Sequence, residues 1–428
     1  QVDVGGDPNA TYFDTAGTIT IEGGATLKTV PSPQGNYTIV NDFVFGGTGG
    51  SINLFFNDND TIFTFNGSFT SAATGAQTLD VRTGVNGNGD REEVTFNTGI
   101  PDVADSSPLG LDVNFQTQSG SYSFVNLVGV NTFTGPINLK KGPNVVSGNL
   151  TIGGRGKGNN GNQYQADQGS GSLGGGSYAG NISLDLNTNL VHNSTLDQTL
   201  SGVISNGSNG AGSLVMKGSG TLTLSGPSTF TGKTAVDTGT LALTSSGGMS
   251  FAVTDSSSNK ITGAGAATLD GTFTIDTSAV TLSVGSWTLV DVASPSYGGS
   301  FGLTGFDPPV GTVHSKSVGS KTWSFDRSTG VLSLTSDAIF TSFTYAGSIG
   351  VIDNNTFSIT LRVPNGTNPA SVAPTYTVTT GTCPQASGAV PTPAFDGITP
   401  VHYVLDDGTY MNDYTVNLVV LPPPPGGV

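Results

Sequence analysis

The residues of this chain that could do chemistry are few, and the densest acidic cluster lies in its first quarter. Oxygen ligands alternate there with glycines, in the order Asn-Gly-Asn-Gly-Asp-Arg-Glu-Glu over residues 86–93. Calcium takes carboxylate and amide oxygens as ligands, so Asn86, Asn88, Asp90 and Glu92 form a calcium candidate. Because the full twelve-residue loop with its closing glutamate is missing, a solvated turn is the favoured interpretation. No other cofactor is expected.

Catalytic groups are sparse elsewhere. His192, His314 and His402 share no motif, and none has a histidine, cysteine or glutamate nearby at metal-ligand spacing. The single cysteine, Cys383, excludes an internal disulfide and lies in a Thr-Cys-Pro stretch without a catalytic signature. No nucleophile-elbow motif supports a Ser-His-Asp site. The sequence therefore predicts no catalytic site, and we expect the chain not to be an enzyme.

Composition indicates that strands must position whatever site exists. The chain has 428 residues, of which 64 are glycine and only 10% are charged. Its Val, Ile, Leu and Phe residues fall in alternating runs, which is typical of a folded all-β protein. The net charge is −16, and residues 1–120 hold 14 acidic but only 3 basic side chains. Nucleic acid and acidic lipid are not expected as partners, because both require a basic face. No apolar run reaches membrane-spanning length.

A repeated pattern organises the chain between residues 213 and 243. Pairs of apolar residues alternate with Thr and Ser, which predicts short strands with one buried face: Leu214 and Met216, Leu222 and Leu224, Leu241 and Leu243. The glycines between them are interpreted as turn residues that can adopt positive φ: Gly218, Gly220, Gly226, Gly232 and Gly239. A weaker copy lies 97 positions earlier, where residues 132–135 repeat the Thr-Phe-Thr-Gly of residues 229–232. Self-similarity of this kind is typical of stacked repeats.

The stretch resembles the autotransporter-associated β-strand repeat of bacterial surface proteins, whose motif has the form GxGTLxLxGxxTFTGxTxVxxGTLxL. The resemblance implies a right-handed parallel β-helix, which we expect over residues 1–336. It also implies a protein that is secreted, extracellular or on the cell surface of a Gram-negative bacterium. Parallel β-helices also serve as polysaccharide lyases and glycosidases, which need clustered carboxylates and a basic residue in a groove. Only three glutamates and five arginines occur, so this enzymatic class is the alternative.

Within residues 1–336 three segments stand out. Residues 1–30 are interpreted as an N-terminal cap or as an arm lent to a neighbouring molecule. The Gly/Asn-rich stretch 153–180 is predicted to be an insertion loop and a plausible contact surface. Ten phenylalanines lie between residues 43 and 124. They are interpreted as a core ladder, with an outward-facing sugar platform as the alternative, and Trp287 and Trp323 are predicted to plug the end of the helix.

The composition changes near residue 337. Short strands separated by turn signals over residues 337–421 fit an immunoglobulin-like β-sandwich. This stretch resembles the tandem immunoglobulin-like modules of bacterial surface proteins, and residues 422–428 form a proline-rich tail.

These features together predict a non-enzymatic extracellular structural protein. We expect a self-assembling surface fibre or filament subunit, or an adhesin, joined head-to-tail through its terminal modules. The expected partners are further copies of the chain, with surface or matrix polysaccharide as a second candidate. The alternative is a secreted carbohydrate-active β-helix enzyme.

Overall fold

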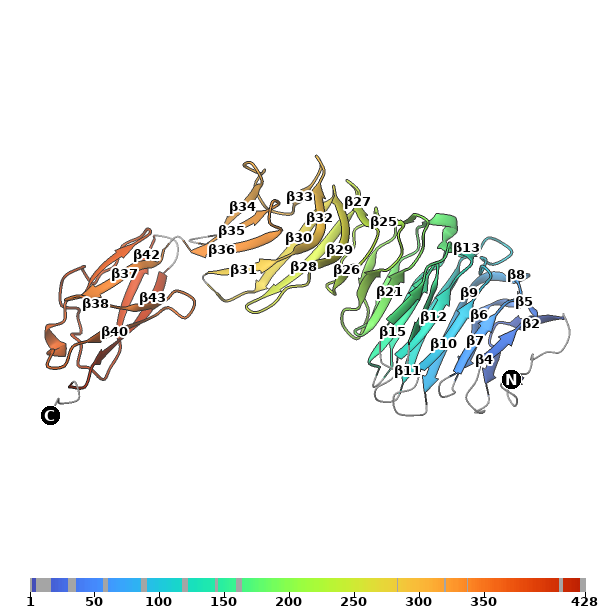
Figure 1. Ribbon diagram of the computed structural model, residues 1–428, viewed down its shortest axis with the longest axis horizontal. Coiled ribbons are helices and arrows are strands. Elements are labelled where there is room, and N and C mark those ends of the chain that lie inside the picture. Colours follow the sequence, from blue (N-terminus) through green and yellow to red (C-terminus); the bar gives the residue numbers. More distant parts are fainter. Residues whose placement is uncertain are drawn as a thin grey trace. The chain divides into compact units, whose positions relative to one another are not determined.

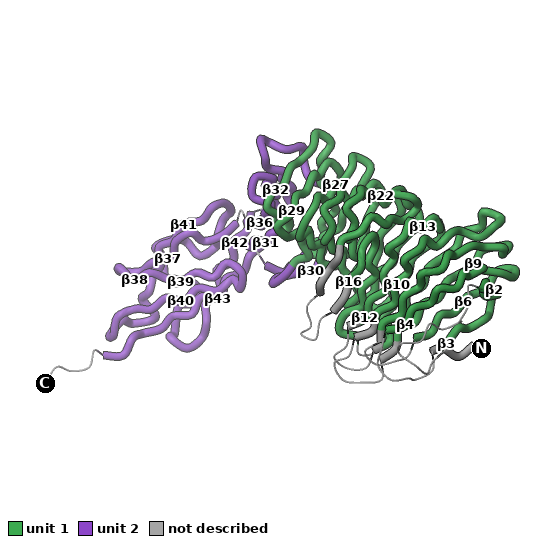
Figure 2. The backbone as a smooth tube through the Cα atoms, turned by 45° about the vertical axis from the view of Figure 1, so that its right-hand side comes forward, with its two compact units in different colours: residues 1–252, 258–276, 289–304 green, residues 253–257, 277–288, 305–428 purple. Residues whose placement is uncertain are grey.

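The computed structural model describes residues 2–4, 17–29, 36–56, 61–85, 91–117, 122–142, 145–158, 164–282, 284–318, 321–336, 338–407 and 411–423. Two compact units can be distinguished (Figure 2). Unit 1 comprises residues 1–252, 258–276 and 289–304, and unit 2 comprises residues 253–257, 277–288 and 305–428. The described residues are almost entirely strands and turns, with two short 3-10 helices, η1 (Gly174–Gly176) and η2 (Pro369–Ser371).

Unit 1 is a parallel β-helix, in which successive coils stack strand on strand (Figure 1). One wall is an eight-stranded sheet, here called sheet A. Its strands are β1 (Val2–Val4), β3 (Thr26–Thr29), β6 (Thr48–Phe56), β9 (Thr74–Val85), β11 (Leu109–Thr117), β14 (Ile137–Lys141), β20 (Ile182–Leu184) and β23 (Ile204–Asn206). All its pairings are parallel.

The second wall, here called sheet B, is also parallel and runs up to β29 (Ile261–Leu269). Its strands before β29 are β4 (Asn36–Ile39), β7 (Thr61–Phe65), β10 (Arg91–Phe96), β12 (Tyr122–Leu127), β15 (Ser147–Ile152), β21 (Thr188–His192), β24 (Ser213–Met216) and β26 (Thr234–Val236). β29 contains a bulge, and its second half pairs with a third wall. The strands of this wall are β27 (Thr240–Leu243), β25 (Thr221–Leu224), β22 (Gln198–Leu200) and β19 (Ser177–Tyr178). On its other side β29 pairs with β32 (Val290–Tyr297), which belongs to the next coil.

Smaller parallel groups complete the coils. They are β2 (Thr18–Glu22), β5 (Asp42–Gly46) and β8 (Phe69–Ser71); β13 (Val130–Asn131) and β18 (Ser172–Leu173); and β28 (Gly248–Thr254), β30 (Thr272–Ala279) and β33 (Gly302–Leu303). Of the segment expected to be an N-terminal cap or arm, β3 and β1 continue sheet A and β2 pairs with β5. These described strands therefore extend the helix walls.

The core of unit 1 is made by columns of identical or similar apolar residues. On sheet A, Leu79, Leu111, Ile137 and Ile182 are register partners on consecutive strands, and each is at most 2% exposed. The repeat residues behave in the same way, because β24, β25 and β27 bury every second side chain. Stacking buries an apolar face that a single coil would expose, so the coils stabilise one another.

The aromatic residues of the first third form an internal ladder, as the core interpretation predicted. Phe65 of β7 stacks on Phe96 of β10 with ring centroids 5.0 Å apart, and Phe43 stacks on Phe69 at 5.2 Å. Phe55 differs, because it lies on the outer face of β6 and is half-buried, with the Lys28 ammonium 5.7 Å from its ring centroid. The alternative, an outward-facing sugar platform, does not fit the buried rings.

The repeat glycines serve a different purpose from the one predicted. Only Gly239 among the five has positive φ, at 69°. At Gly232 a Cβ atom would lie 1.6 Å from the carbonyl oxygen of Gly212, and similar clashes arise at Gly218, Gly220 and Gly226. These glycines are therefore needed because the preceding coil approaches their backbone too closely for any side chain.

The segment 153–180, expected to be a loop, contains regular structure. Strands β16 (Arg155–Gly158) and β17 (Tyr164–Asp167) form an antiparallel hairpin. After it, β18 pairs in parallel with β13, and β19 pairs with β22, so the chain has returned to the helix wall by Ser172. The glycines and amides of this segment are compatible with strands because their backbone groups pair with neighbouring coils.

Unit 2 holds antiparallel sheets. One contains β31 (Gly285–Thr288), β36 (Val331–Ser336), β35 (Lys321–Asp326) and β34 (Val313–Val318). It buries Trp287 and Trp323 with ring centroids 5.5 Å apart, and the Trp287 indole donates to the Thr254 carbonyl at 2.8 Å. This confirms that the two tryptophans are core residues.

The remaining strands of unit 2 form two sheets around one core. The first sheet has β38 (Ser348–Ile349), β37 (Phe340–Tyr345) and β41 (Thr375–Val378), and the second has β39 (Val351–Asp353), β40 (Ser358–Val363), β43 (Met411–Val420) and β42 (Val401–Asp406). Both sheets contribute to the core, which includes Phe343, Leu361 and Tyr403. All pairings are antiparallel except β40 with β43. The all-β class is confirmed, whereas the immunoglobulin-like description and the boundary at residue 337, which falls inside unit 2, stay predictions.

Candidate functional site

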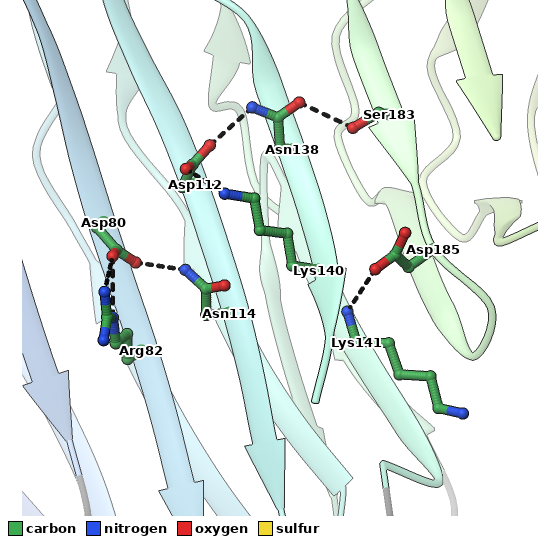
Figure 3. Close-up of polar contacts among 9 residues, drawn as sticks. All are labelled: Asp80, Arg82, Asp112, Asn114, Asn138, Lys140, Lys141, Ser183 and Asp185. Atoms are coloured by element: carbon green, nitrogen blue, oxygen red, sulfur yellow. Dashed lines mark hydrogen bonds and ion pairs between the residues drawn. The ribbon is translucent and has the colours of Figure 1, made fainter. Parts of the chain in front are cut away.

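The outer face of sheet A carries a ladder of polar side chains over four consecutive coils (Figure 3). Each coil supplies an apolar-polar-apolar-polar tetrapeptide, Leu-Asp-Val-Arg at 79–82, Leu-Asp-Val-Asn at 111–114, Ile-Asn-Leu-Lys at 137–140 and Ile-Ser-Leu-Asp at 182–185. Because side chains alternate along a strand, the apolar residues enter the core and the polar ones face outward. The parallel register then places the outward residues of neighbouring coils side by side.

Asp80 is nearly buried and fully engaged. Arg82, two residues along β9, donates to one of its carboxylate oxygens at 2.6 and 2.9 Å. Asn114 of the next coil donates to the other oxygen at 2.5 Å. The hydrogen bond to Asp80 raises the pKa of the Arg82 guanidinium. Arginine and amide together neutralise and satisfy this carboxylate.

Asp112 is the register partner of Asp80, so two carboxylates follow one another on the ladder. Asp112 accepts hydrogen bonds from Asn138 at 2.7 Å and from the Lys140 ammonium at 2.5 Å. Asn138 in turn accepts from the Ser183 hydroxyl at 2.8 Å. Each acid therefore has its own cation, which offsets the repulsion that two adjacent carboxylates would otherwise cause.

Asp185 ends the ladder and is 2% exposed. Its oxygens accept from the backbone N–H of Lys141 at 2.9 Å, and from the backbone and side chain of Asn209 at 3.0 and 2.9 Å. Burial by itself raises the pKa of Asp185, but these hydrogen bonds outweigh it and leave the pKa below its usual value. The carboxylate thus stays ionised and ties three coils together.

The ladder is suited to holding coils in register. Its carboxylates are committed to arginine, lysine and amide partners, whereas general acid or base catalysis uses a carboxyl that can exchange a proton with substrate. Sequence reasoning missed these residues. The signal that could have found them is the recurrence of the apolar-polar-apolar-polar tetrapeptide. This recurrence is hard to see because the copies are unequally spaced and begin at residues 79, 111, 137 and 182.

The outer face of sheet B is covered in part by the β16–β17 hairpin. β16 contacts β10, β12 and β15. Beneath it Glu93 is fully buried and accepts from Thr95 at 3.2 Å, from Asn126 at 3.3 Å and from the Arg155 guanidinium. Arg155 begins the hairpin, so an ion pair to a buried carboxylate fastens this segment to the helix wall.

The residues singled out by the sequence are not brought together. Of the calcium candidates, Asn86, Asn88 and Asp90 lie outside the described residues, and Glu92 belongs to β10 without a described side chain. Within the described ranges no three His, Cys, Asp or Glu side chains are grouped as metal ligands. Calcium binding therefore stays a prediction.

The histidines and the cysteine lie in separate places. His192 faces the helix core on β21, where burial lowers its pKa to about 4, and His314 is also buried, which lowers its pKa. His402 is exposed, with its Nδ1 atom 2.9 Å from an Asp413 oxygen. Cys383 is half-buried, and burial raises the pKa of its thiol.

Two family matches agree with this architecture. Residues 214–243, the repeat that begins at β24, match the passenger-associated transport repeat. Residues 340–418, the two sheets with a shared core, match the domain described as SGBP, N-terminal. No curated protein matches the chain. A β-helix with such repeats, followed by such a domain, is typical of a surface or secreted protein built on β-repeats.

The described part of the chain contains no helix with the length and hydropathy that a bilayer crossing requires. The Gram-negative origin expected from the resemblance stays a prediction.

Proposed function

We propose that this chain is a non-enzymatic surface adhesin whose partner is a glycan. The observation that carries the proposal is the match of residues 340–418 to the SGBP N-terminal domain, a name that denotes surface-glycan binding. The sheet A ladder adds support, because its carboxylates are bonded by side chains and backbone groups of the β-helix itself and not left free for a substrate.

A panel of neutral and acidic polysaccharides tests this proposal with the full chain, with and without calcium. Affinity electrophoresis reports retention, while reducing ends and ultraviolet absorbance report hydrolysis and elimination. We expect retention by at least one polymer and no product. Release of product would establish the carbohydrate-active enzyme instead, and no retention by any polymer would contradict the adhesin.

Self-assembly is a second candidate, favoured by the free edges of the unit 2 sheets. β38 and β39 are edge strands, and they expose Ile349 by 78% and Val351 by 68%. An exposed apolar edge is a template for strand addition by another chain. A second copy paired at this edge would begin a filament of the kind predicted from the sequence.

Electron microscopy and sedimentation of the Ile349→Lys/Val351→Lys variant test assembly. Charges on an edge strand oppose pairing, so we expect filaments from the native chain and monomers from the variant. Val310→Lys is the matched control, because Val310 is 86% exposed but lies outside these strands. Monomers of the native chain at every concentration would contradict assembly and leave the adhesin proposal intact.

A further inference from the structure

The outer face of sheet B is open beyond the hairpin and forms a groove of about 290 Å³. Its lining comes from four consecutive coils, at and beside β15, β21, β24 and β26. Every lining residue has an odd number, which on these strands means that it faces outward. The groove is therefore a regular surface of the β-helix that repeats at the spacing of its strands, about 4.8 Å.

The floor of the groove is apolar. Val191, Val215 and Ala235 are register partners on successive strands and form a column along the outer face. Val215 is half-buried, whereas Val191 and Ala235 are buried. Val215, the accessible residue of this strip, can contact the nonpolar C–H face of a sugar ring.

One side of the groove carries amide groups. Asn189 donates to Asn149 at 2.9 Å and to the Ser147 hydroxyl at 3.0 Å, so the amides are held in a fixed orientation. Asn149 also donates to the Ser123 carbonyl at 3.3 Å. Amides that are oriented by their neighbours are suited to hydrogen bonding with hydroxyl groups, because little side-chain entropy remains to be lost.

The charge of the groove distinguishes it from the rest of the chain. Lys217 pairs with Asp237, while Lys233 is exposed and makes no ion pair within the described residues. The groove thus has two lysines and one aspartate in a chain whose net charge is −16. Because Lys233 is the continuation of the Asn149–Asn189 column, its ammonium and the amides lie along one edge of the apolar floor.

We propose that this groove binds an anionic polysaccharide, with a ring carboxylate at Lys233, hydroxyls at the asparagine amides and a ring face over Val215. The inference rests on the proposed function and names the ligand class and the place of binding. A polymer matches the groove better than a single sugar, because the lining extends over four consecutive coils. An acidic polypeptide shares the charge but lacks the hydroxyl groups.

Binding of polygalacturonate to the full chain tests the inference, with the carboxyl-reduced polymer as the neutral probe. We expect Lys233→Gln to weaken binding about three- to fivefold at low salt, the range of a partly exposed ion pair, and the loss to shrink as salt rises. Lys141→Gln is the matched control, because it removes the same charge from sheet A, where Lys141 donates its backbone N–H to Asp185. That control should bind as the native chain does.

Val215→Asp is the stronger variant. It places a carboxylate on the floor, so repulsion should weaken polygalacturonate binding at least about tenfold. Val215→Thr conserves shape without charge and should retain binding. Circular dichroism and thermal unfolding of each variant test whether the fold is unchanged, which we expect for outward positions.

Three results would overturn the inference. They are equal affinity for polygalacturonate and the reduced polymer, unchanged affinity in Lys233→Gln and Val215→Asp, or equal competition by polyglutamate. Polysaccharide binding that survives both variants would place the ligand elsewhere, and then the groove fails while the adhesin proposal stands. Absence of binding to every polysaccharide would contradict both.

Discussion

On sheet A the outward charged side chains form ion pairs and hydrogen bonds with one another, whereas on sheet B the side chain of Lys233 borders an open groove. Asp112 lies between Asn138 and Lys140, and Asp80 between Arg82 and Asn114. Lys233 has no ion pair within the described residues. Both faces belong to the same parallel β-helix, and both follow the same alternation of side chains. The difference shows that one scaffold can use outward polar residues to fasten coils on one wall and leave them available for a partner on another.

The largest effect is expected from removing the most engaged acid of the ladder. Asp185→Ala leaves three N–H donors, from Lys141 and Asn209, without their acceptor. The free energy of unfolding should fall by roughly 2 to 4 kcal/mol, since a buried donor without an acceptor costs about 1–3 kcal/mol, whereas the donors of the exposed Asn209 can turn to water. Chemical denaturation measures this loss. Asp185→Asn keeps one acceptor oxygen and should lose less, and an equal loss in both variants would contradict the role of the hydrogen bonds.

A pH effect of similar size is expected from the core behind sheet B. His192 faces inward on β21, and its ring nitrogens lack partners within the described residues. Burial lowers its pKa from 6.5 to about 4. Between these values the unfolded chain binds the proton and the folded chain does not, so stability is full above pH 6.5 and declines as the pH falls towards 4. The loss at pH 4 is about 3 kcal/mol.

His192→Met should remove the contribution of His192 to this pH dependence, because methionine does not titrate. A methionine fits the site, since Met216 occupies the next position of the same column. Denaturation curves at intervals between pH 7 and pH 4 measure the slope. The lowered pKa of Asp185 acts at more acid pH, since its contribution is present above the ordinary value and is lost as pH falls through the lowered one. Because the buried His314 also has a lowered pKa, it should leave a residual slope in the variant. A slope between pH 6.5 and 4 that is undiminished in His192→Met would contradict the assignment.

A smaller effect is expected for the ion pair between Asp112 and Lys140. The lysine side chain is 46% exposed and the aspartate 18%. A double-mutant cycle with Asp112→Asn and Lys140→Gln should give a coupling free energy of about 0.2–1 kcal/mol, which salt reduces. A coupling near zero at low salt would mean that the amide partner, Asn138, satisfies Asp112 without the lysine.

The smallest effect on stability is expected in the groove. Lys233→Gln should change the free energy of unfolding by less than about 0.5 kcal/mol, because the side chain is exposed and makes no ion pair within the described part of the chain. The same denaturation assay measures it beside the sheet A variants. A loss comparable with that of Asp185→Ala would show that the lysine belongs to the scaffold.

Much of the fold could be predicted because side-chain alternation is a local property. Leu214 and Met216 are buried as expected, and residues 340–345 and 375–378 form two of the short strands predicted over residues 337–421. The reason for Gly232 could not be predicted, since it depends on how closely the preceding coil approaches. Local pattern thus gives strands, while the distance between coils is a tertiary property.

The sites were harder to predict for the same reason. The partners Glu93 and Arg155 are 62 residues apart in the sequence. The groove strands are unequally spaced along the chain and begin at residues 147, 188, 213 and 234. Loops of different length between strands hide which residues become neighbours. Without the register, the charges of Lys233 and Asp112 could be counted but not assigned to a wall.

Chemical footprinting of lysines tests the central difference between the two walls most directly. The full chain is acetylated with and without polygalacturonate, and mass spectrometry reads the modification at Lys233 and at Lys141 in the same sample. We expect the polymer to protect Lys233 and to leave Lys141 unchanged, because only the first borders the groove. Equal protection of both lysines, or protection of Lys141 alone, would contradict the assignment of binding to sheet B.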